Sequence, residues 1–279
     1  MADQIQQESG DPTSEDFSDN IPTGKRAIGL LHTVEGTSAG SSVLKTADLG
    51  RMNLDIFAKQ RINAPLGFFN AYGREHEGTL EKTNPTAGPT RITSFIPLYY
   101  AEEPNGIPVQ TVKDLVYSVE HSQGDYSNKL DTSVDATATL RVLYSSKVQF
   151  NYVPEIERST LQFNGAGTET LDLNESDVVH LYVREKESNA NSDIIDRIDV
   201  TKDGERVTAR GVDADAVKDA SVITANVETP QSQWAHLSLM EGSAQAGGYQ
   251  NSQVDVEVTT NAGGTVQIVS FRRVPRNQA

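Results

Sequence analysis

Hydrophobic and polar residues alternate in several short stretches of this chain, and the alternation is clearest near its C-terminal end. There, Val254, Val256 and Val258 are separated by Asp255 and Glu257. Successive side chains of a β-strand point to opposite faces, so this alternation indicates a strand with one buried and one solvated face.

Similar stretches rich in β-branched and aromatic residues recur along the chain, separated by clusters of Gly, Pro, Asn, Asp and Ser. This spacing is typical of an all-β sandwich or barrel. The predicted strands cover residues 26–33, 91–100, 136–144, 147–153, 160–163, 178–184, 194–201, 205–209, 221–227, 234–240, 254–258 and 266–268.

Turn residues between some of these strands predict hairpins. Asp203-Gly204 between two β-rich runs is a strong signal for a two-residue hairpin turn. The expected hairpins join residues 194–201 with 205–209, 136–144 with 147–153, and 254–258 with 266–268.

Two stretches of the first half have hydrophobic residues near helical spacing and predict short helices. In residues 44–62 the spaced residues are Leu49, Met52, Ile56 and Phe57. In residues 111–120 they are Val112, Leu115, Val116 and Val119, with Thr111 as a candidate N-cap.

The composition along the chain predicts four parts. Residues 1–24 are polar and acidic and contain Pro12 and Pro22, so we expect an extended arm. This arm is either disordered in an isolated monomer or ordered by lying on a neighbouring subunit. Residues 25–154 form a first β-rich module with the short helices, residues 155–275 a second β-sandwich module, and residues 276–279 a tail.

The charge balance adds a prediction about the solvent. The chain of 279 residues has 39 Asp and Glu against 24 Lys and Arg, a formal net charge of −15. An acidic surface keeps a protein dispersed in molar salt, where the Debye length is about 3 Å. We therefore favour a halophilic protein over an ordinary acidic one. The same charge argues against a free-standing nucleic-acid binder, which needs a clustered basic face.

The sequence contains no recognisable catalytic centre, and we predict that the protein is not an enzyme. No two of the five histidines have the spacing of a HExxH metal motif, and no G-x-S-x-G elbow or P-loop is present. The chain has no cysteine, and we expect neither a membrane-spanning stretch nor a secretory signal.

One acidic cluster is a candidate cation site. Asp213, Asp215 and Asp219 could supply two or three of the oxygens that Ca²⁺ requires. An acidic surface loop is the alternative interpretation of the same residues. We predict no cofactor other than this Ca²⁺ or another structural cation.

The C-terminal segment is a candidate partner contact. Arg272, Arg273 and Arg276 lie within five residues on a strongly acidic background. They could contact an acidic partner surface, a phospholipid layer or packaged nucleic acid. The alternative is a solvated tail.

Together, an acidic arm, a β-rich body and a basic C-terminal end resemble the jelly-roll major capsid proteins of internal-membrane icosahedral viruses of halophiles. The local resemblance lies in residues 171–207, which look like adjoining strands of such a barrel, and in residues 254–274, which look like its closing hairpin. It covers roughly the C-terminal 120 residues. The resemblance implies jelly-roll barrels packed into capsomers, an arm reaching neighbours, a basic face towards the particle interior and no catalytic residues.

The favoured hypothesis is a virion structural protein, a capsid subunit of a halophilic virus that self-associates into capsomers and is assembled in the host cytoplasm. Its partners would be other capsid or virion proteins, together with an internal membrane or the packaged genome contacted through the basic tail. The alternatives are a tail-tube, decoration or spike protein, and an extracellular β-sandwich that binds carbohydrate or Ca²⁺.

Overall fold

The fold was derived from a computed structural model of the chain. The structure describes residues 7–10, 17–21, 24–40, 43–69, 87–98, 107–111, 113–121, 124, 126, 129–131, 136–144, 152–173, 177–186, 189, 193–208, 235–239 and 252–275.

The chain divides into two compact units. Unit 1 comprises Met1–Pro154 together with Pro275–Ala279, and unit 2 comprises Glu155–Val274. Within the described residues of both units, strands make up nearly all of the regular structure, and no helix is long and apolar enough to cross a membrane.

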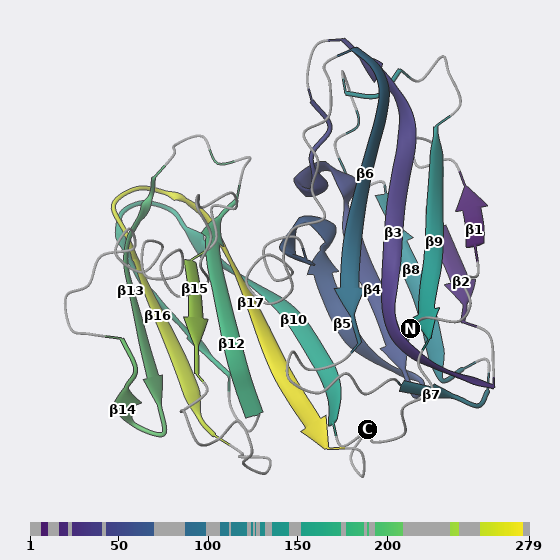
Figure 1. The fold of residues 1–279 in the computed structure, drawn as a ribbon. Helices are drawn as coiled ribbons and strands as arrows, with labels where there is room; N and C mark the ends of the chain where they lie inside the picture. Colours follow the sequence, from purple (N-terminus) through teal and green to yellow (C-terminus); the bar gives the residue numbers. More distant parts are fainter. Residues whose placement is uncertain are drawn as a thin grey trace. The chain divides into compact units, whose positions relative to one another are not determined.

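Unit 1 contains two antiparallel sheets (Figure 1). In the first sheet the strand order is β1 (Gln7–Gly10), β9 (Thr137–Tyr144), β3 (Lys25–Ala39) and β6 (Ala87–Pro97), and β7 (Ile107–Val109) also pairs with β3. In the second sheet the order is β2 (Phe17–Asn20), β8 (Leu115–Glu120), β4 (Arg51–Ile56) and β5 (Lys59–Pro65).

The core of unit 1 consists of the alternate residues that each sheet turns inward. On β4, Met52, Leu54 and Ile56 are fully buried, whereas the residues between them are half-buried. On β3, Leu30 and Val34 are fully buried in the same way. Burying one such side chain contributes about 1.5–3 kcal/mol, so the alternation holds the sheets together.

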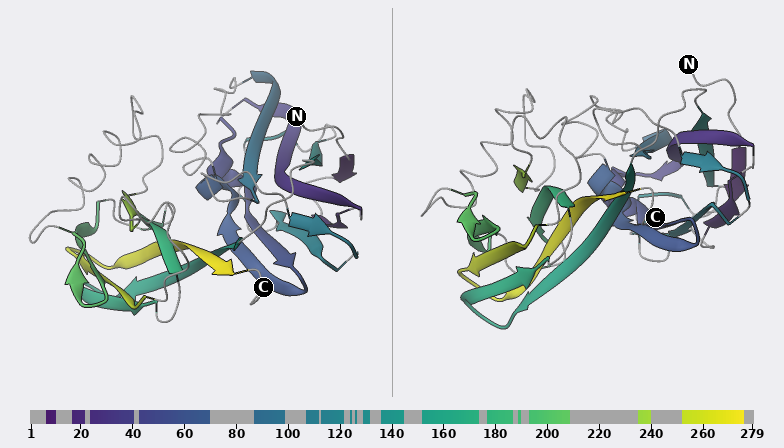
Figure 2. Two further views of the ribbon diagram at one scale, coloured as in Figure 1. Left: turned by 60° about the horizontal axis from the view of Figure 1, so that its bottom comes forward. Right: turned by 90° about the horizontal axis from the view of Figure 1, so that it is seen from below.

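Unit 2 also contains two sheets. In one the order is β10 (Tyr152–Phe163), β17 (Gly264–Pro275), β12 (Asp177–Glu185) and β15 (Ala235–Ser238). In the other the order is β11 (Gly167–Asp172), β16 (Val254–Thr260), β13 (Ile195–Lys202) and β14 (Glu205–Arg206). Figure 2 shows these strands from two further directions. Val254, Val256 and Val258 belong to the hydrophobic core of this unit.

The described strands of the two units have the same topology. If β7 is set aside and the strands of each unit are numbered 1 to 8 in chain order, both units have the sheet orders 1-8-3-6 and 2-7-4-5. Most consecutive strands therefore lie in opposite sheets, which is the arrangement of a jelly roll. The chain is an all-β protein with a jelly-roll arrangement in each unit.

The exception to this crossing is a tight hairpin, which occurs at the equivalent place in both units. β4 and β5 are joined by Phe57 and Ala58, with φ angles of 53° and 58°, and β13 and β14 by Asp203 and Gly204, with 52° and 80°. Positive φ at both central residues matches a type I′ turn, whose twist suits the flanking strands. The predicted Asp203-Gly204 hairpin is confirmed.

The two predicted helices are wrong. Residues 44–62 form a short 3₁₀ helix, η1 (Thr46–Leu49), followed by β4 and the beginning of β5. Leu54, which the helical spacing did not use, is as fully buried as Met52 and Ile56, so the period is two. Hydrophobic residues at positions 52 and 56 satisfy a helix and a strand equally, and the neighbouring sheet decides between them.

Residues 111–120 likewise form a turn and then β8, in which Leu115, Tyr117 and Val119 are buried and alternate with half-buried residues. Thr111 does not cap a helix. Its N–H and hydroxyl both donate to the Asp114 carboxylate, at 2.8 Å each, which closes the turn that precedes the strand. Asp114 thus reverses the chain locally, as Asp side chains often do in turns.

Two predicted hairpins are wrong in their pairing, and of the predicted strand 147–153 only residues 152 and 153 are described, at the start of β10. β16 pairs with β11 and β13, while β17 pairs with β12, so residues 261–264 carry the chain from one sheet to the other. β9 pairs with β1 and β3 on its two sides. Alternation shows which face a strand buries but not which strand lies beside it. The predicted strand at 221–227 lies outside the described residues.

The N-terminal arm has partners within the chain along its described residues. β1 pairs with β9 from Gln7 to Gly10, and β2 pairs with β8 from Phe17 to Asn20. Each strand lies at the edge of one sheet of unit 1. The expectation of an arm without a partner in its own chain is therefore wrong for these two stretches, because two open sheet edges offer them backbone hydrogen bonds.

Gly50 lies between η1 and β4, and the backbone of Glu120 and of Gly124 passes close to it. Its φ is 88°, and a Cβ there would overlap the carbonyl oxygen of Glu120. We expect Gly50→Ala to lower the free energy of unfolding by about 3 kcal/mol, the sum of left-handed strain and a forced backbone shift. Urea denaturation followed by circular dichroism measures the change.

The matched control is Gly204→Ala, whose φ is 80° but whose added Cβ meets no atom within 4 Å. It should cost only the backbone strain, about 1 kcal/mol. Equal losses for the two variants would contradict the close packing at Gly50.

Candidate functional site

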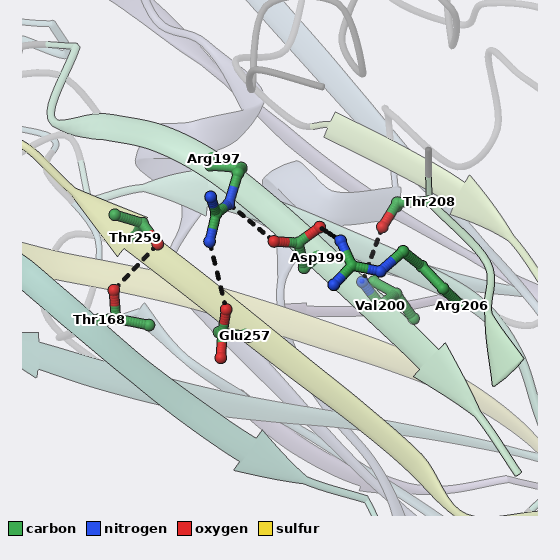
Figure 3. A network of polar contacts seen from close by, with 8 residues as sticks. All are labelled: Thr168, Arg197, Asp199, Val200, Arg206, Thr208, Glu257 and Thr259. Carbon is green, nitrogen blue, oxygen red and sulfur yellow. Dashed lines mark hydrogen bonds and ion pairs between the residues drawn. The ribbon is translucent and has the colours of Figure 1, made fainter. Parts of the chain in front are cut away.

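The outer face of the β11–β16–β13–β14 sheet of unit 2 carries a network of polar side chains (Figure 3). The strand register aligns Thr168, Thr259 and Arg197 in one row across the sheet. The next row contains Glu257 and Asp199. These positions alternate with the buried valines of β16, so the network lies on the side of the sheet away from the core.

The network is a chain of alternating charges across three strands. Arg197 lies 2.7 Å from Asp199 and 3.4 Å from Glu257, and Arg206 lies 2.7 Å from the other oxygen of Asp199. The Asp199 side chain is 9% exposed, whereas those of Arg197, Arg206 and Glu257 are 41% to 43% exposed. Exposed pairs contribute little individually, but Asp199 holds one guanidinium on each side and so orders the β13–β14 hairpin.

Hydroxyl contacts complete this face. Thr168 and Thr259 contact each other at 3.0 Å across β11 and β16, and the Thr208 hydroxyl accepts the N–H of Val200 at 3.0 Å. The face is thus a flat, ordered and charged surface. It can bind a polar partner through side chains that the sheet already holds in place.

Two of the three arginines predicted as partner contacts lie in β17, and both form ion pairs within unit 2. Arg273 lies 2.6 Å from Asp177, and the two side chains are 6% and 3% exposed. Arg272 is 14% exposed and lies 3.1 Å from Glu157 and 3.6 Å from Glu155. Both guanidinium groups therefore stabilise the unit. Contact of this segment with a partner stays a prediction.

The other predicted site residues lie outside the described part of the chain. They are Arg276 and the candidate cation ligands Asp213, Asp215 and Asp219. Among the described residues, no group of three or more His, Asp or Glu side chains is arranged to hold a metal ion. The cation site stays a prediction.

A buried polar cluster joins the two sheets of unit 1. His32 of β3 lies with its Nδ1 2.8 Å from the hydroxyl of Tyr117 on β8, and with its Nε2 3.2 Å from Nε2 of His121. His32 and Tyr117 are fully buried, and His121 is 2% exposed. Burial and repulsion by His121 lower the pKa of His32 to about 3, so this imidazole is neutral in the folded chain at neutral pH.

Unit 2 contains a second histidine pair. Nε2 of His236 on β15 lies 3.1 Å from Nδ1 of His180 on β12, and the His236 ring stacks on Tyr182 at 4.5 Å. His180 is buried, but His236 is half-buried. The two histidines lie on the neighbouring strands β12 and β15 of one sheet, whereas the pair in unit 1 joins opposite sheets.

The sequence does not indicate either histidine pair. The partners are 89 and 56 residues apart in the chain, so no local spacing could indicate them. His32 and His180 both occur in apolar strand patterns, which is typical of structural histidines. Which histidine each of them contacts was not predictable, because the two members of a pair lie on segments that are distant in the chain and meet only in the fold.

Comparison with known proteins gives a match in fold without a match in sequence. No protein-family model matches the chain, and no curated protein matches it. The major capsid protein of Bacteriophage PM2 aligns with a TM-score of 0.63 at 7% identity, covering 99% of this chain and 100% of that one. A chain of Sulfolobus Turreted Icosahedral Virus aligns with a TM-score of 0.65 at 12% identity, covering 98% and 91%. The Faustovirus major capsid protein aligns with a TM-score of 0.55 at 9% identity, covering 98% and 90%.

The resemblance to jelly-roll major capsid proteins is therefore confirmed for the fold. At these identities the likeness concerns the fold alone. It also corrects the extent of the sequence-based resemblance, which was placed in the C-terminal residues, because the alignments cover 98% to 99% of the chain. The first half was misjudged because its strands were interpreted as helices.

The Asp177–Arg273 pair tests whether the C-terminal arginines stabilise unit 2. Asp177→Ala leaves the Arg273 guanidinium buried without its carboxylate, so we expect a loss of about 3–5 kcal/mol in the free energy of unfolding. Chemical denaturation at neutral pH measures it.

Glu157→Ala is the matched control, since Glu157 is 54% exposed and pairs with Arg272. Its loss should stay within about 1 kcal/mol. Similar small losses in both variants would mean that Arg273 is not held by Asp177.

Proposed function

We propose that this chain is a virion structural protein, a capsid subunit that self-associates into the shell of a virus. The observation that supports the proposal is the match in fold, over almost the whole chain, to the major capsid proteins of Bacteriophage PM2 and Faustovirus. A fold alone does not determine function. Here, however, the alignments cover 98% to 99% of this chain and 90% to 100% of the compared chains.

The proposed role does not involve catalysis. A shell subunit needs rigid sandwiches, polar outer faces and neighbours that bind those faces. The Glu257–Arg197–Asp199–Arg206 chain of charges is a face of this kind, because it is exposed and ordered at the same time. Its partners in this proposal are further copies of the chain and other virion proteins, assembled in the host cytoplasm.

The net charge of −15 sets the proposed conditions of assembly. Copies of so acidic a chain repel one another in dilute buffer, and molar salt removes this repulsion by shortening the Debye length to about 3 Å. We therefore place the virus in a high-salt environment, where short-range contacts between copies outweigh the repulsion.

The N-terminal segment supplies a mechanism for contact between copies. β1 and β2 are four-residue strands at sheet edges, and they pair with β9 and β8 through the backbone. The same edges of a second copy present the same backbone groups, so the arm can be exchanged between subunits as in domain swapping. In the shell, the arm would link neighbours in this way.

The C-terminal end is the proposed contact with an internal membrane or the packaged genome. Because Arg272 and Arg273 form ion pairs inside unit 2, this contact rests mainly on Arg276. Charge attraction to phosphate requires several basic groups, so the proposed contact would be formed by many copies together.

Assembly in salt tests the proposal directly. We expect negative-stain electron microscopy of the purified chain in about 2–4 M salt to show regular rings, sheets or shells, and dilute buffer to give mostly monomers. A monomer at every salt and protein concentration would contradict a capsid role.

A chain lacking residues 1–24 is the matched control for the arm. It should lose only the strand signal of β1 and β2 from its far-ultraviolet circular dichroism, and it should form fewer or less regular assemblies, since β9 and β8 lose the exchangeable strands. Unchanged assemblies would remove the arm from the mechanism and leave the capsid role intact.

The proposed cation site has a separate test. Millimolar Ca²⁺ should raise the melting temperature of the protein, and the variant with both Asp213→Ala and Asp215→Ala should lose this response because a Ca²⁺ site needs several carboxylate oxygens. The double variant Asp193→Ala and Asp196→Ala, which removes two exposed acids of unit 2, is the control for net charge. An equal Ca²⁺ response in all three proteins would exclude the site.

A further inference from the structure

The most unusual part of the core of unit 1 is its polar cluster, because it places two histidine rings and a tyrosine hydroxyl among buried residues that are mostly apolar. On β3 the inward neighbours of His32 are Leu30 and Val34, both fully buried. The register places Leu140 of β9 on one side of His32 and Ser94 of β6 on the other. A titratable ring is thus enclosed in hydrophobic surroundings, where a charge is costly.

The cluster is also the polar connection between the two sheets of unit 1. His32 belongs to the β1–β9–β3–β6 sheet, whereas Tyr117 belongs to β8 in the β2–β8–β4–β5 sheet, and His121 follows β8 directly. The 2.8 Å and 3.2 Å contacts of His32 therefore join one sheet to the other.

The contacts of His32 oppose an additional proton on its own ring. Burial raises the pKa of Tyr117 well above its usual value, so its hydroxyl keeps its proton and can donate to Nδ1 of His32. The Nε2–H of neutral His32 can then donate to Nε2 of His121. A proton added to Nδ1 of His32 would compete with the Tyr117 hydroxyl. A proton added to Nε2 of His121 would make two N–H groups face each other unless His32 moved its own proton to Nδ1.

Among the described residues, the titratable and charged groups nearest the cluster are its own tyrosine and histidines, a second tyrosine and an acid that is already paired. From β8 and the segment after it, His32 faces Tyr117 and His121, and the His121 ring in turn contacts Tyr126 edge-on at 6.1 Å. The acid in this chain of described contacts is Asp48, which adds to the effect of burial in raising the pKa of Tyr126 and is itself paired with Lys129 at 2.6 Å. From β3, β6 and β9, the inward residues adjacent to His32 are uncharged.

We propose that the cluster of His32, Tyr117 and His121 is an acid-sensitive connection between the two sheets, which makes unit 1 open before unit 2 when the protein is acidified. In unit 2 the corresponding pair is not enclosed in this way. His236 is half-buried and stacks on Tyr182, so this pair is partly open to solvent. The device depends on unit 1 alone and not on the proposed capsid role.

The direction of the pH effect follows from linkage. The pKa of His32 is lowered from 6.5 to about 3 in the folded chain, so between these values the unfolded chain binds a proton that the folded chain does not. The contribution of His32 to stability is complete above about pH 6.5 and falls as the pH decreases towards 3. The ratio of closed to open unit 1 should therefore fall by about fivefold between pH 6.5 and 5.5 and about tenfold in the next pH unit, or about fiftyfold between pH 6.5 and 4.5.

Pulsed hydrogen exchange with mass spectrometry tests the inference on the full chain. The protein is held at pH 7.5, 6.5, 5.5 and 4.5 in subdenaturing urea and then labelled in a short pulse at one common pH. We expect peptides from β3, β8 and β9 to become labelled as the pH decreases, while peptides from β12, β16 and β17 stay protected. Simultaneous opening of both units, or earlier opening of unit 2, would overturn the proposal.

Two variants assign the effect to the cluster. His32→Gln keeps a hydrogen-bond donor and acceptor but cannot titrate near neutral pH, so the opening of unit 1 should become nearly independent of pH between 6.5 and 4.5. His236→Gln is the matched control in unit 2 and should keep the pH dependence of the original chain. An unchanged pH dependence in His32→Gln would overturn the proposal.

A measurement on the unaltered chain decides the matter if His32→Gln does not fold. Nuclear magnetic resonance of the histidine ring Cε1–H signals follows each protonation directly. The His32 signal of the folded chain should not shift between pH 7.5 and 4.5, while the signal of the open form appears and grows. A folded-state His32 that titrates near pH 6.5 would overturn the proposal.

Discussion

The structure depends on one constraint, which is that each strand has a single apolar face and must bury it against a second sheet. In both units this burial is achieved by alternate residues, such as Met52, Leu54 and Ile56 in unit 1 and Val254, Val256 and Val258 in unit 2. Each of these side chains contributes about 1.5–3 kcal/mol when buried. Because most successive strands go to opposite sheets, neither sheet of a unit can form its core before the chain has crossed between them several times.

The same constraint explains what the sequence could predict. Alternation is a local property, so the strands at residues 254–258 and 178–184 and the Asp203-Gly204 turn were predictable. Partner choice is not local: β16 and β17 follow each other in the chain but pair with different strands. In residues 44–62 the spacing of Met52 and Ile56 suited a helix, and only the burial of Leu54 against the facing sheet distinguishes the strand from it.

The polar sites also combine residues that the sequence makes visible with partners that it does not. The three C-terminal arginines were visible as a group, but their partners were not, since Asp177 is 96 residues from Arg273. Burial of that pair makes it part of the framework of unit 2. His32 and His121 were visible only as isolated residues, and the enclosure that distinguishes them arises when β3 and the end of β8 meet across the core.

Within each unit, apolar inward faces and a few enclosed polar pairs hold the two sheets together, whereas the outer faces carry exposed polar side chains. In the proposed capsid role, association between copies would use these outer faces and the short edge strands. Its dependence on salt would follow from the net charge of −15.

Cryo-electron microscopy of assembled particles, at a resolution that separates strands about 4.8 Å apart, tests the central claim most directly. The account predicts that every subunit in the shell contains two β-sandwiches, each with the sheet orders 1-8-3-6 and 2-7-4-5. Particles whose subunits contain only one such sandwich, or in which this chain is absent from the shell, would contradict it.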